Sequence, residues 1–234
     1  MRVWDTGRAS AKTNMSQDEF LLQSLEHDPQ AALHLYDWQG DCVTHGHFIR
    51  PEKYFHLDKI QQKNLDLQKR PTGGGIIFHM YDVTFSLAIP IGHPLYFVNT
   101  MECYAAVNNI VVEVICDFLG RSCEPTLLDT QPKLQHVVSK HFCMACPTKY
   151  DVILDGKVGG SAQRRTRHGY LHQGSISVVK PSYDLLCEVL RDGDQVVQEM
   201  EQQGQALLPE GSSDREFLEA KQTLRQLLKK SCKS

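Results

Sequence analysis

Long hydrophobic runs are missing from this sequence of 234 residues. Its most apolar segment, Ile110–Ile115, is far shorter than the roughly 18 residues that a membrane-spanning helix needs. The first twenty residues also contain no apolar stretch of the kind found in secretion signals. We therefore expect a cytoplasmic protein that has no membrane partner.

A strong excess of either charge is also absent. The formal net charge is −3, with 25 lysines and arginines against 28 aspartates and glutamates. Nonspecific binding to nucleic acid requires a basic surface, because the phosphate backbone dominates the affinity. We therefore expect no nucleic-acid partner.

Cysteine is sparse, with eight residues spread along the chain. This spread is unlike the dense disulfide frameworks of small secreted proteins and favours a reducing compartment with free thiols. Cys143 and Cys146 form the one C-x-x-C pair. Because a zinc site needs about four ligands and no second pair exists, we expect no metal site.

Strand and helix periodicities are interspersed along the chain. Residues 1–14 are expected to form a polar, mobile start, and Ser16 with Glu19 makes a capping box for the first helix. Asp155-Gly156 is a hairpin-turn pair. Further strands are predicted within 32–48, 76–78, 83–89, 150–154 and 171–179, and further helices after Thr100, from Pro181 onward and after the capping box of Ser213 and Glu216. This mixture predicts an α+β fold with a central mixed, largely antiparallel β-sheet flanked by helices.

Three consecutive glycines, Gly73, Gly74 and Gly75, precede the predicted strand 76–78. Glycines let a backbone approach a ligand closely and point its amides at an anion. Arg70 adds a planar, permanently charged donor for a carboxylate or phosphate. A flexible turn also explains a short glycine run, so the glycines alone leave both interpretations open.

A second glycine-rich motif follows the predicted strand 150–154. It contains Lys157, Gly159, Gly160 and Ser161. A lysine fixed on a strand beside glycines is well placed to contact an acyl carbonyl or a phosphate. Taken alone, however, the pattern favours a surface hairpin with a solvated lysine.

The C-x-x-C pair allows a redox pair, a nucleophile or two small half-buried residues. A redox pair is typical near a βαβ unit, whereas this pair precedes a hairpin. Pro147 precludes a regular helix or central strand, so we expect the loop to lie exposed at a cleft mouth. Taken alone, the pair favours the interpretation as two small half-buried residues.

The two glycine motifs together resemble the superfamily of lipoate–protein ligases, octanoyltransferases and, more distantly, biotin–protein ligases. The arginine–triple glycine–valine–phenylalanine–histidine pattern of the family is matched by Arg70, Gly73, Gly74, Gly75, Phe78 and His79. Its lysine–x–x–glycine–serine–alanine pattern is matched by Lys157, Gly160, Ser161 and Ala162. The strand that follows is matched by 171–176, with His172 and Gly174. The resemblance covers about residues 15–179. It implies a single catalytic domain over 1–234, with its core at about 15–180 and a helical C-terminal segment at 181–234.

Within this superfamily, the spacing is most similar to that of the cysteine-dependent octanoyltransferases. Cys143, Pro147 and Tyr150 match the spacing of their nucleophile loop, which places Cys143 rather than Cys146 at the reactive position. Gly75, by contrast, completes a ligase-like triple glycine where these transferases often carry arginine. Gln173 stands where both branches carry histidine.

The resemblance implies catalytic roles for Cys143 and Lys157. Substrate-binding roles are implied for Arg70, Gly73, Gly74, Gly75, His79, Gly160, Ser161, Ala162, His172 and Gly174. Cys143 would accept an octanoyl group from octanoyl–acyl carrier protein and pass it to a lysine of a dehydrogenase lipoyl domain or the glycine-cleavage H protein, without cofactor. The alternative is a lipoate ligase that uses lipoate, ATP and Mg²⁺ through lipoyl-adenylate. A third possibility is a non-catalytic binder of acylated carrier domains.

Overall fold

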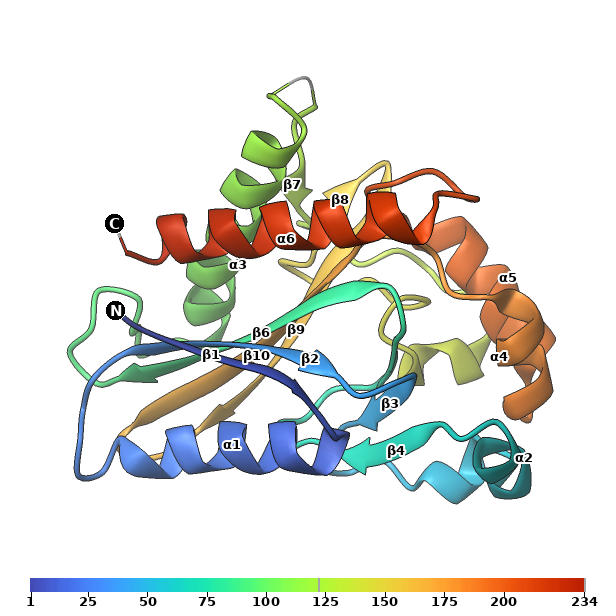
Figure 1. Ribbon diagram of the computed structural model, residues 1–234, viewed down its shortest axis with the longest axis horizontal. Coiled ribbons are helices and arrows are strands. Elements are labelled where there is room, and N and C mark those ends of the chain that lie inside the picture. Colours follow the sequence, from blue (N-terminus) through green and yellow to red (C-terminus); the bar gives the residue numbers. More distant parts are fainter. Residues whose placement is uncertain (122, 234) are drawn as a thin grey trace.

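The computed structural model describes residues 1–121 and 123–233, whose strands form two sheets (Figure 1). The large sheet has the order β1 (Arg2–Ala9), β2 (Ala32–Trp38), β6 (Asp82–Pro90), β10 (Gly169–Ser177), β9 (Gly156–Arg165), β8 (Val152–Leu154) and β7 (Thr126–Leu127). Only β1 and β2 pair in parallel among these described strands. The small sheet has the order β4 (Asp66–Lys69), β3 (Cys42–His45) and β5 (Ile76–His79). The predicted mixed, largely antiparallel sheet is confirmed.

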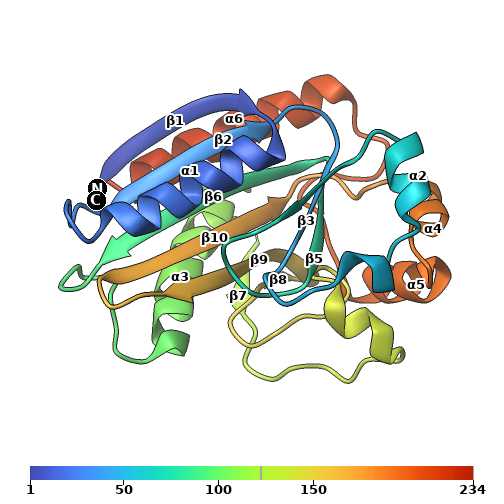
Figure 2. The same ribbon diagram turned by 90° about the horizontal axis from the view of Figure 1, so that it is seen from below.

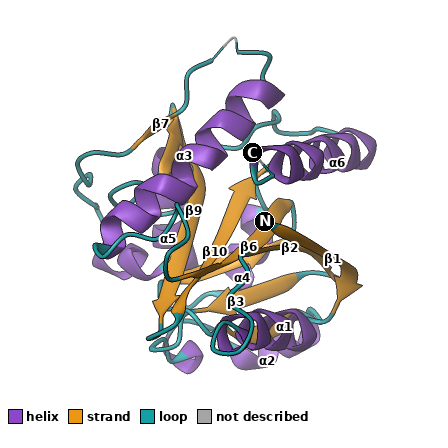
Figure 3. Cartoon of the chain, turned by 90° about the vertical axis from the view of Figure 1, so that its left-hand side faces the viewer, coloured by secondary structure: helices purple, strands orange, loops and turns teal. Residues whose placement is uncertain are grey.

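Helices cover both faces of the large sheet, as Figures 1 and 3 show. The helices are α1 (Ala11–Ser24), α2 (Leu57–Gln62), α3 (Thr100–Phe118), α4 (Tyr183–Val189), α5 (Gly193–Gln203) and α6 (Asp214–Ser231), with short 3-10 turns η1 (Pro51–Lys53) and η2 (Val137–His141). α3 and α6 pack on one face, where Val111 and Leu224 join the main hydrophobic core. α1 packs on the other face through Leu21 and Leu22 (Figure 2).

The alternation along β6 separates a core face from a pocket face. Val83, Phe85, Leu87 and Ile89 point into the core beneath α3 and α6. The residues between them lie on the side of α1, where Ala88 packs against that helix. Successive side chains of a strand point to opposite faces, so one sequence pattern builds both the core and a pocket wall. Both faces are buried, which is why the whole strand is inaccessible to solvent.

A second hydrophobic core lies between the small sheet and helices α2, α4 and α5. Val43 and Ile76 contribute from the strands, and Leu186 and Met200 from the helices. Phe142 packs into the same core and lies next to Cys143 in the chain. The segment carrying the candidate nucleophile is therefore anchored in a packed core.

The expected mobile start over residues 1–14 is wrong. Arg2–Ala9 form β1, which pairs in parallel with β2. The helix begins at Ala11, where the Ser10 side chain accepts the N–H of Thr13, and not at Ser16. β1 is an edge strand with exposed side chains, so its polar sequence resembles that of a loop.

The two ends of α3 and the start of α6 agree with the sequence to within one residue. Asn99, rather than Thr100, caps α3 by accepting the N–H of Met101. Gly120 follows α3 with φ +64°, the left-handed geometry typical of a C-terminal glycine. The predicted capping box of Ser213 and Glu216 is present at α6.

The lengths and compositions of the helices can be compared with those of a membrane-spanning helix. Within residues 1–121 and 123–233, every helix is too short or too polar to span a bilayer.

Candidate active site

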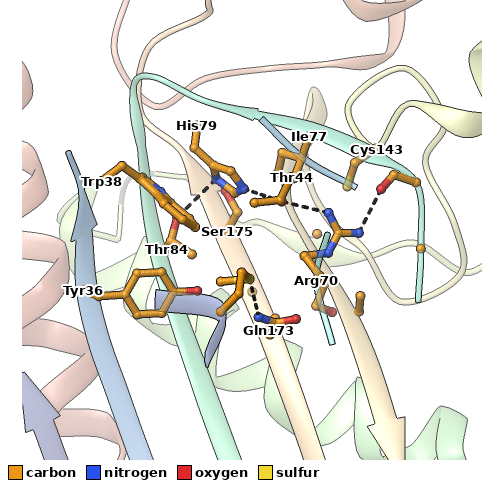
Figure 4. A pocket seen from close by; sticks show the side chains of 17 residues that line it. Tyr36, Trp38, Thr44, Arg70, Ile77, His79, Thr84, Cys143, Gln173 and Ser175 are labelled. Carbon is orange, nitrogen blue, oxygen red and sulfur yellow. Dashed lines mark hydrogen bonds between the residues drawn. The ribbon is translucent and has the colours of Figure 1, made fainter. Parts of the chain in front are cut away.

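The two glycine motifs meet in one pocket between the small sheet and the large sheet. The pocket is lined from the first motif by Arg70, Gly74, Gly75, Ile77 and His79, and from the second by Gly160, Ser161 and Ala162. Cys143, Gln173, Gly174 and Ser175 complete this part of the wall (Figure 4). Segments about eighty residues apart in the sequence thus face one cavity.

Arg70 organises the first glycine motif from within. Its side chain is 7% exposed. One guanidinium nitrogen donates to the Thr44 hydroxyl at 2.9 Å, and the other donates to the carbonyls of Gly73 and Gly75 at 2.9 Å each. These bonds hold the turn in a defined shape, so it is not a flexible connection. Gly73 itself does not line the pocket but supplies one of these acceptors.

Gly75 has a steric role. A Cβ at this position would lie 2.4 Å from the carbonyl oxygen of His141. This close approach lets Ile76 pair with Phe142, and the Cys143 N–H donates to the Ile76 carbonyl at 2.8 Å. The third glycine therefore presses the glycine motif against the cysteine loop.

Cys143 and Lys157 lie in direct contact. The Lys157 ammonium is 3.4 Å from the Cys143 sulfur and donates to the Cys143 carbonyl at 2.7 Å. Gly160 makes room for this pair, because a Cβ there would lie 2.7 Å from Cε of Lys157 and 3.2 Å from Sγ of Cys143. A cation beside a sulfur stabilises the thiolate, which is the nucleophilic form of cysteine.

Lys157 is buried, and the expectation of a solvated hairpin lysine is wrong. Its side chain is 2% exposed, and its ammonium lies 2.7 Å from the carboxylate of Asp151. Burial alone would lower the pKa of Lys157, but the charge of Asp151 and the Cys143 sulfur raise it above its ordinary value. Lys157 is therefore charged at neutral pH, with the ion pair compensating for the lost hydration.

The loop that carries Cys143 and Cys146 is more buried than we expected from Pro147. Cys143 is half-buried, whereas Phe142 and Ala145 are buried in the second core. Cys146 is also buried, and burial raises the pKa of its thiol. Proline excluded a helix or central strand here, but it did not decide burial. The two cysteines thus differ in exposure and in contact with Lys157.

His79 belongs to a buried hydrogen-bond cluster on the pocket wall. Its Nδ1 lies 2.7 Å from Asp82, which also accepts the hydroxyls of Thr84 at 2.8 Å and Ser175 at 2.6 Å. Burial alone would raise the pKa of Asp82, but His79 and these hydroxyls hold it below its ordinary value. The His79 ring stacks on Trp38 with centroids 4.4 Å apart (Figure 4). These polar groups are satisfied among themselves, so the wall can face an apolar ligand.

Gln173 joins the glycine motif to α1. Its amide oxygen accepts the Thr72 hydroxyl at 2.6 Å, and its amide nitrogen donates to Asp18 at 2.6 Å. Asp18 also accepts Ser86 at 2.7 Å and Tyr36 at 3.1 Å and lies 2.7 Å from His34. The glutamine side chain therefore bridges two elements of the pocket wall.

His172 lies away from the pocket. It points from β10 toward α3, near Phe85 and Tyr104, and is fully buried. Burial lowers its pKa to about 3, so the ring is neutral. Gln163 lies 2.8 Å from Nδ1, and Nε2 has no partner among the described residues. The structure thus places Gly174 at the pocket but not its neighbour His172.

Several pocket residues were not singled out from the sequence. Tyr36, Trp38, Thr44 and Thr84 line the cavity but were not among the predicted site residues. The β6 alternation could have indicated Thr84, because it lies on the face opposite the core. Asp151 follows Tyr150 in the spacing of the nucleophile loop, but the sequence did not indicate its contact with Lys157.

The sequence places this chain in a known family of catalytic domains. A family model described as the lipoyl protein ligase A/B catalytic domain matches residues 10–210, and the chain belongs to this family. It is 30% identical over 178 residues to the octanoyltransferase LipM of Staphylococcus aureus, covering 74% of this chain and 63% of that protein. It is 27% identical over 179 residues to LipM of Bacillus subtilis, covering 75% and 64%. The chain spans less than two thirds of the length of these relatives.

Solved structures share the fold at lower identity. A lipoate-protein ligase A bound with ATP superposes with a TM-score of 0.71 at 19% identity, over 99% of this chain and 85% of that one. A putative lipoate protein ligase from T. acidophilum with bound lipoic acid gives 0.65 at 18% identity, over 99% and 85%. These likenesses establish the architecture.

Proposed function

We propose that this protein transfers an octanoyl or lipoyl group to a lysine of a lipoyl-carrier domain through an acyl-cysteine on Cys143. The observation that carries the proposal is the 3.4 Å contact between the Lys157 ammonium and the sulfur of Cys143, which lines the pocket. The LipM relatives support octanoyl transfer as the reaction. Membership of the lipoyl ligase family supports a lipoyl-carrier acceptor.

The first step transfers the acyl group to sulfur. The Cys143 thiolate attacks the thioester carbonyl of octanoyl–acyl carrier protein, a new thioester forms, and the carrier thiol leaves with a proton. A free thiol of ordinary pKa is only a few per cent ionised at neutral pH, so a neighbouring cation increases the reactive fraction. Lys157 supplies that cation and lies close enough to stabilise negative charge on the carbonyl oxygen.

The second step passes the acyl group to nitrogen. The neutral amine of the acceptor lysine attacks the Cys143 thioester, an amide forms, and the Cys143 sulfur leaves, while the proton lost by the amine returns the cysteine to a thiol. The proposed acceptors are the glycine-cleavage H protein and the lipoyl domains of 2-oxoacid dehydrogenases. Neither step requires a metal or nucleotide, because a thioester is already activated.

The apolar part of the pocket wall is the proposed site of the acyl chain. Tyr36, Trp38 and Ile77 provide apolar surface, and the polar groups beside them are already hydrogen-bonded. Burying six methylenes at ~0.8 kcal/mol each would contribute about 5 kcal/mol before the entropy of binding is subtracted. The pocket would therefore favour an octanoyl chain over a short one, with little discrimination between neighbouring lengths.

Gly75 does not require an ATP-dependent mechanism. Its ligase-like position is explained by the close approach of the His141 carbonyl. Two nitrogens of Arg70 are likewise engaged, one by the carbonyls of Gly73 and Gly75 and the other by the Thr44 hydroxyl of β3. In an ATP-dependent ligase, Mg²⁺ and ATP would be needed and Cys143 would be dispensable.

Intact-mass spectrometry tests the proposal. The protein is mixed with octanoyl–acyl carrier protein without ATP and then treated with hydroxylamine, which cleaves thioesters. We expect one octanoyl adduct that hydroxylamine removes and that is absent from Cys143→Ser. A protein that attaches lipoate only with ATP and Mg²⁺ would instead be a ligase. Loss of both reactions, with acylated carrier still bound, would indicate a non-catalytic binder.

A further inference from the structure

We propose that Asp151 is a positioning residue that keeps Lys157 charged and aimed at the Cys143 sulfur. The inference rests on the proposed acyl-cysteine function and extends it by one residue. Asp151 does not line the pocket and touches the reacting sulfur only through Lys157.

Asp151 contacts Thr148 on one side and Lys157 on the other. Its Oδ2 lies 2.7 Å from the Lys157 ammonium and also accepts the N–H of Thr148 at 2.7 Å and its hydroxyl at 2.9 Å. The side chains of Asp151 and Lys157 are 5% and 2% exposed. The carboxylate is therefore fixed from one side by Thr148 and presents its charge to the lysine on the other.

The backbone before Asp151 is shaped to point it inward. Tyr150 has φ +69°, a left-handed conformation that is uncommon for a bulky residue. Asn108 of α3 donates to the Tyr150 carbonyl at 2.7 Å, and the Tyr150 N–H donates to Leu128 at 2.8 Å. An uncommon conformation held by hydrogen bonds on both sides indicates that the surrounding structure determines it.

Burial makes the charge of Lys157 depend on its neighbours. A buried lysine without a counterion tends to lose its proton, because the charged form loses its hydration. Among the titratable groups around Lys157, Asp151 is the carboxylate in contact with it. Cys143 and Cys146 face it from the cysteine loop, and Arg70 from the glycine motif adds a positive charge near Cys143.

Tyr104 of α3 also lies near Asp151 and Cys143. Burial raises its pKa to about 12, so the phenol stays neutral at physiological pH. Asp151 is therefore the negative group that stabilises the lysine charge at rest, before the Cys143 thiol ionises.

The test measures how readily Cys143 ionises, without requiring acyl transfer. Iodoacetamide alkylates thiolates, and tandem mass spectrometry separates alkylation at Cys143 from alkylation at Cys146. The rate is measured from pH 5 to 10 in the full-length protein and in Asp151→Asn. Removing a negative charge near a thiol would by direct electrostatics lower the midpoint of this curve. If Asp151 acts through Lys157, the midpoint instead rises by about one to three pH units.

Two further variants isolate the pathway. In Lys157→Met, the lysine is absent, so adding Asp151→Asn should lower the midpoint and reverse the sign of the effect. Asp155→Asn removes the same charge from the exposed β8–β9 turn and should leave the midpoint unchanged. An unchanged or lowered midpoint in folded Asp151→Asn would overturn the proposal, as would the same sign of effect in both backgrounds.

A measurement on the unaltered protein covers the case in which Asp151→Asn does not fold. The Lys157 Cε resonance is assigned by its absence from Lys157→Met in carbon-13 lysine spectra. We expect the chemical shift of an ammonium from pH 6 to 9. Titration of Lys157 below pH 9 would contradict the role of Asp151.

The alkylation and NMR results do not depend on the acyl donor. A missing octanoyl adduct with the expected midpoint shift would therefore reject the proposed function and leave the Asp151–Lys157–Cys143 linkage standing. An octanoyl adduct without the midpoint shift would support the proposed function and reject the Asp151–Lys157–Cys143 linkage.

Discussion

Asp18 and Asp151 are buried carboxylates in two regions beside the pocket, and their surroundings differ. The partners of Asp18 are His34, Tyr36, Ser86 and Gln173, of which Tyr36 and Gln173 line the pocket. The main partner of Asp151 is Lys157, which also contacts the Cys143 sulfur. One carboxylate is enclosed in a structural cluster, whereas the other is connected to the proposed site of reaction.

The surroundings of Asp18 maintain the shape of the protein beside the pocket, whereas the surroundings of Asp151 also affect the chemistry at Cys143. A cluster whose members bond only to one another fixes strands and helices relative to each other. A cluster with one charged member at the pocket also sets the electrostatic field at the reacting atom. Changes near Asp18 should therefore alter stability, whereas changes near Asp151 should alter reactivity as well.

The largest effect is expected at the sulfur. Cys143→Ser should lower octanoyl transfer by more than about 1000-fold, because a hydroxyl without a dedicated base is a poor nucleophile. Cys146→Ser should keep turnover within about tenfold. Transfer to a lipoyl domain is measured with both variants without ATP. Equal losses in the two variants would contradict the distinction between the cysteines.

The second effect concerns Lys157, whose buried ammonium is paired with Asp151. Lys157→Ala should lose transfer and also lower the free energy of unfolding by about 3–5 kcal/mol, because Asp151 is left buried and unpaired. Urea unfolding of the variant and the unaltered protein measures the change. Stability within about 0.5 kcal/mol would mean that the pair is solvated.

The third change tests the structural cluster. Asp18→Asn should lower the free energy of unfolding by about 3 kcal/mol, because several donors converge on one carboxylate. Transfer per folded molecule should stay within about threefold, since Asp18 does not contact Lys157 or Cys143. A loss of turnover without a loss of stability would show that Asp18 affects the reaction and would contradict the distinction between the two regions.

The smallest effect is a pH dependence at His172. Its pKa in the folded protein is about 3, below the ordinary histidine value of 6.5, so protons bind preferentially to the unfolded chain. The stability present above pH 6.5 should fall by ~2 kcal/mol as the pH decreases to 5. His172→Gln should remove this part of the decrease. Parallel stability curves for both proteins over this pH range would contradict a buried, neutral His172.

Much of the fold follows from local patterns in the sequence. The alternation along 83–89, the Asp155-Gly156 turn and the capping box at Ser213 each predicted the element that the structure contains. These signals are local, because they depend on residues a few positions apart. The edge strand β1 was missed because an exposed strand has the polar composition of a loop.

The site was harder to predict, because its decisive contacts are not local. Gly160 and Cys143 matched family patterns, but the burial of Lys157 depends on Asp151 across the β8–β9 hairpin. The bond between Gln173 and Asp18 joins residues 155 positions apart. No period or turn signal encodes such pairs, so residue types alone favoured a solvated lysine.

The central claim is that an acyl group on Cys143 lies on the route to the acceptor lysine. The most direct measurement isolates the octanoyl-enzyme, adds a lipoyl domain without ATP, and follows both proteins by rapid-quench mass spectrometry. We expect the octanoyl group to leave Cys143 and appear on the acceptor lysine at least as fast as steady-state turnover. An octanoyl-enzyme that persists, or that transfers more slowly than turnover, would contradict it.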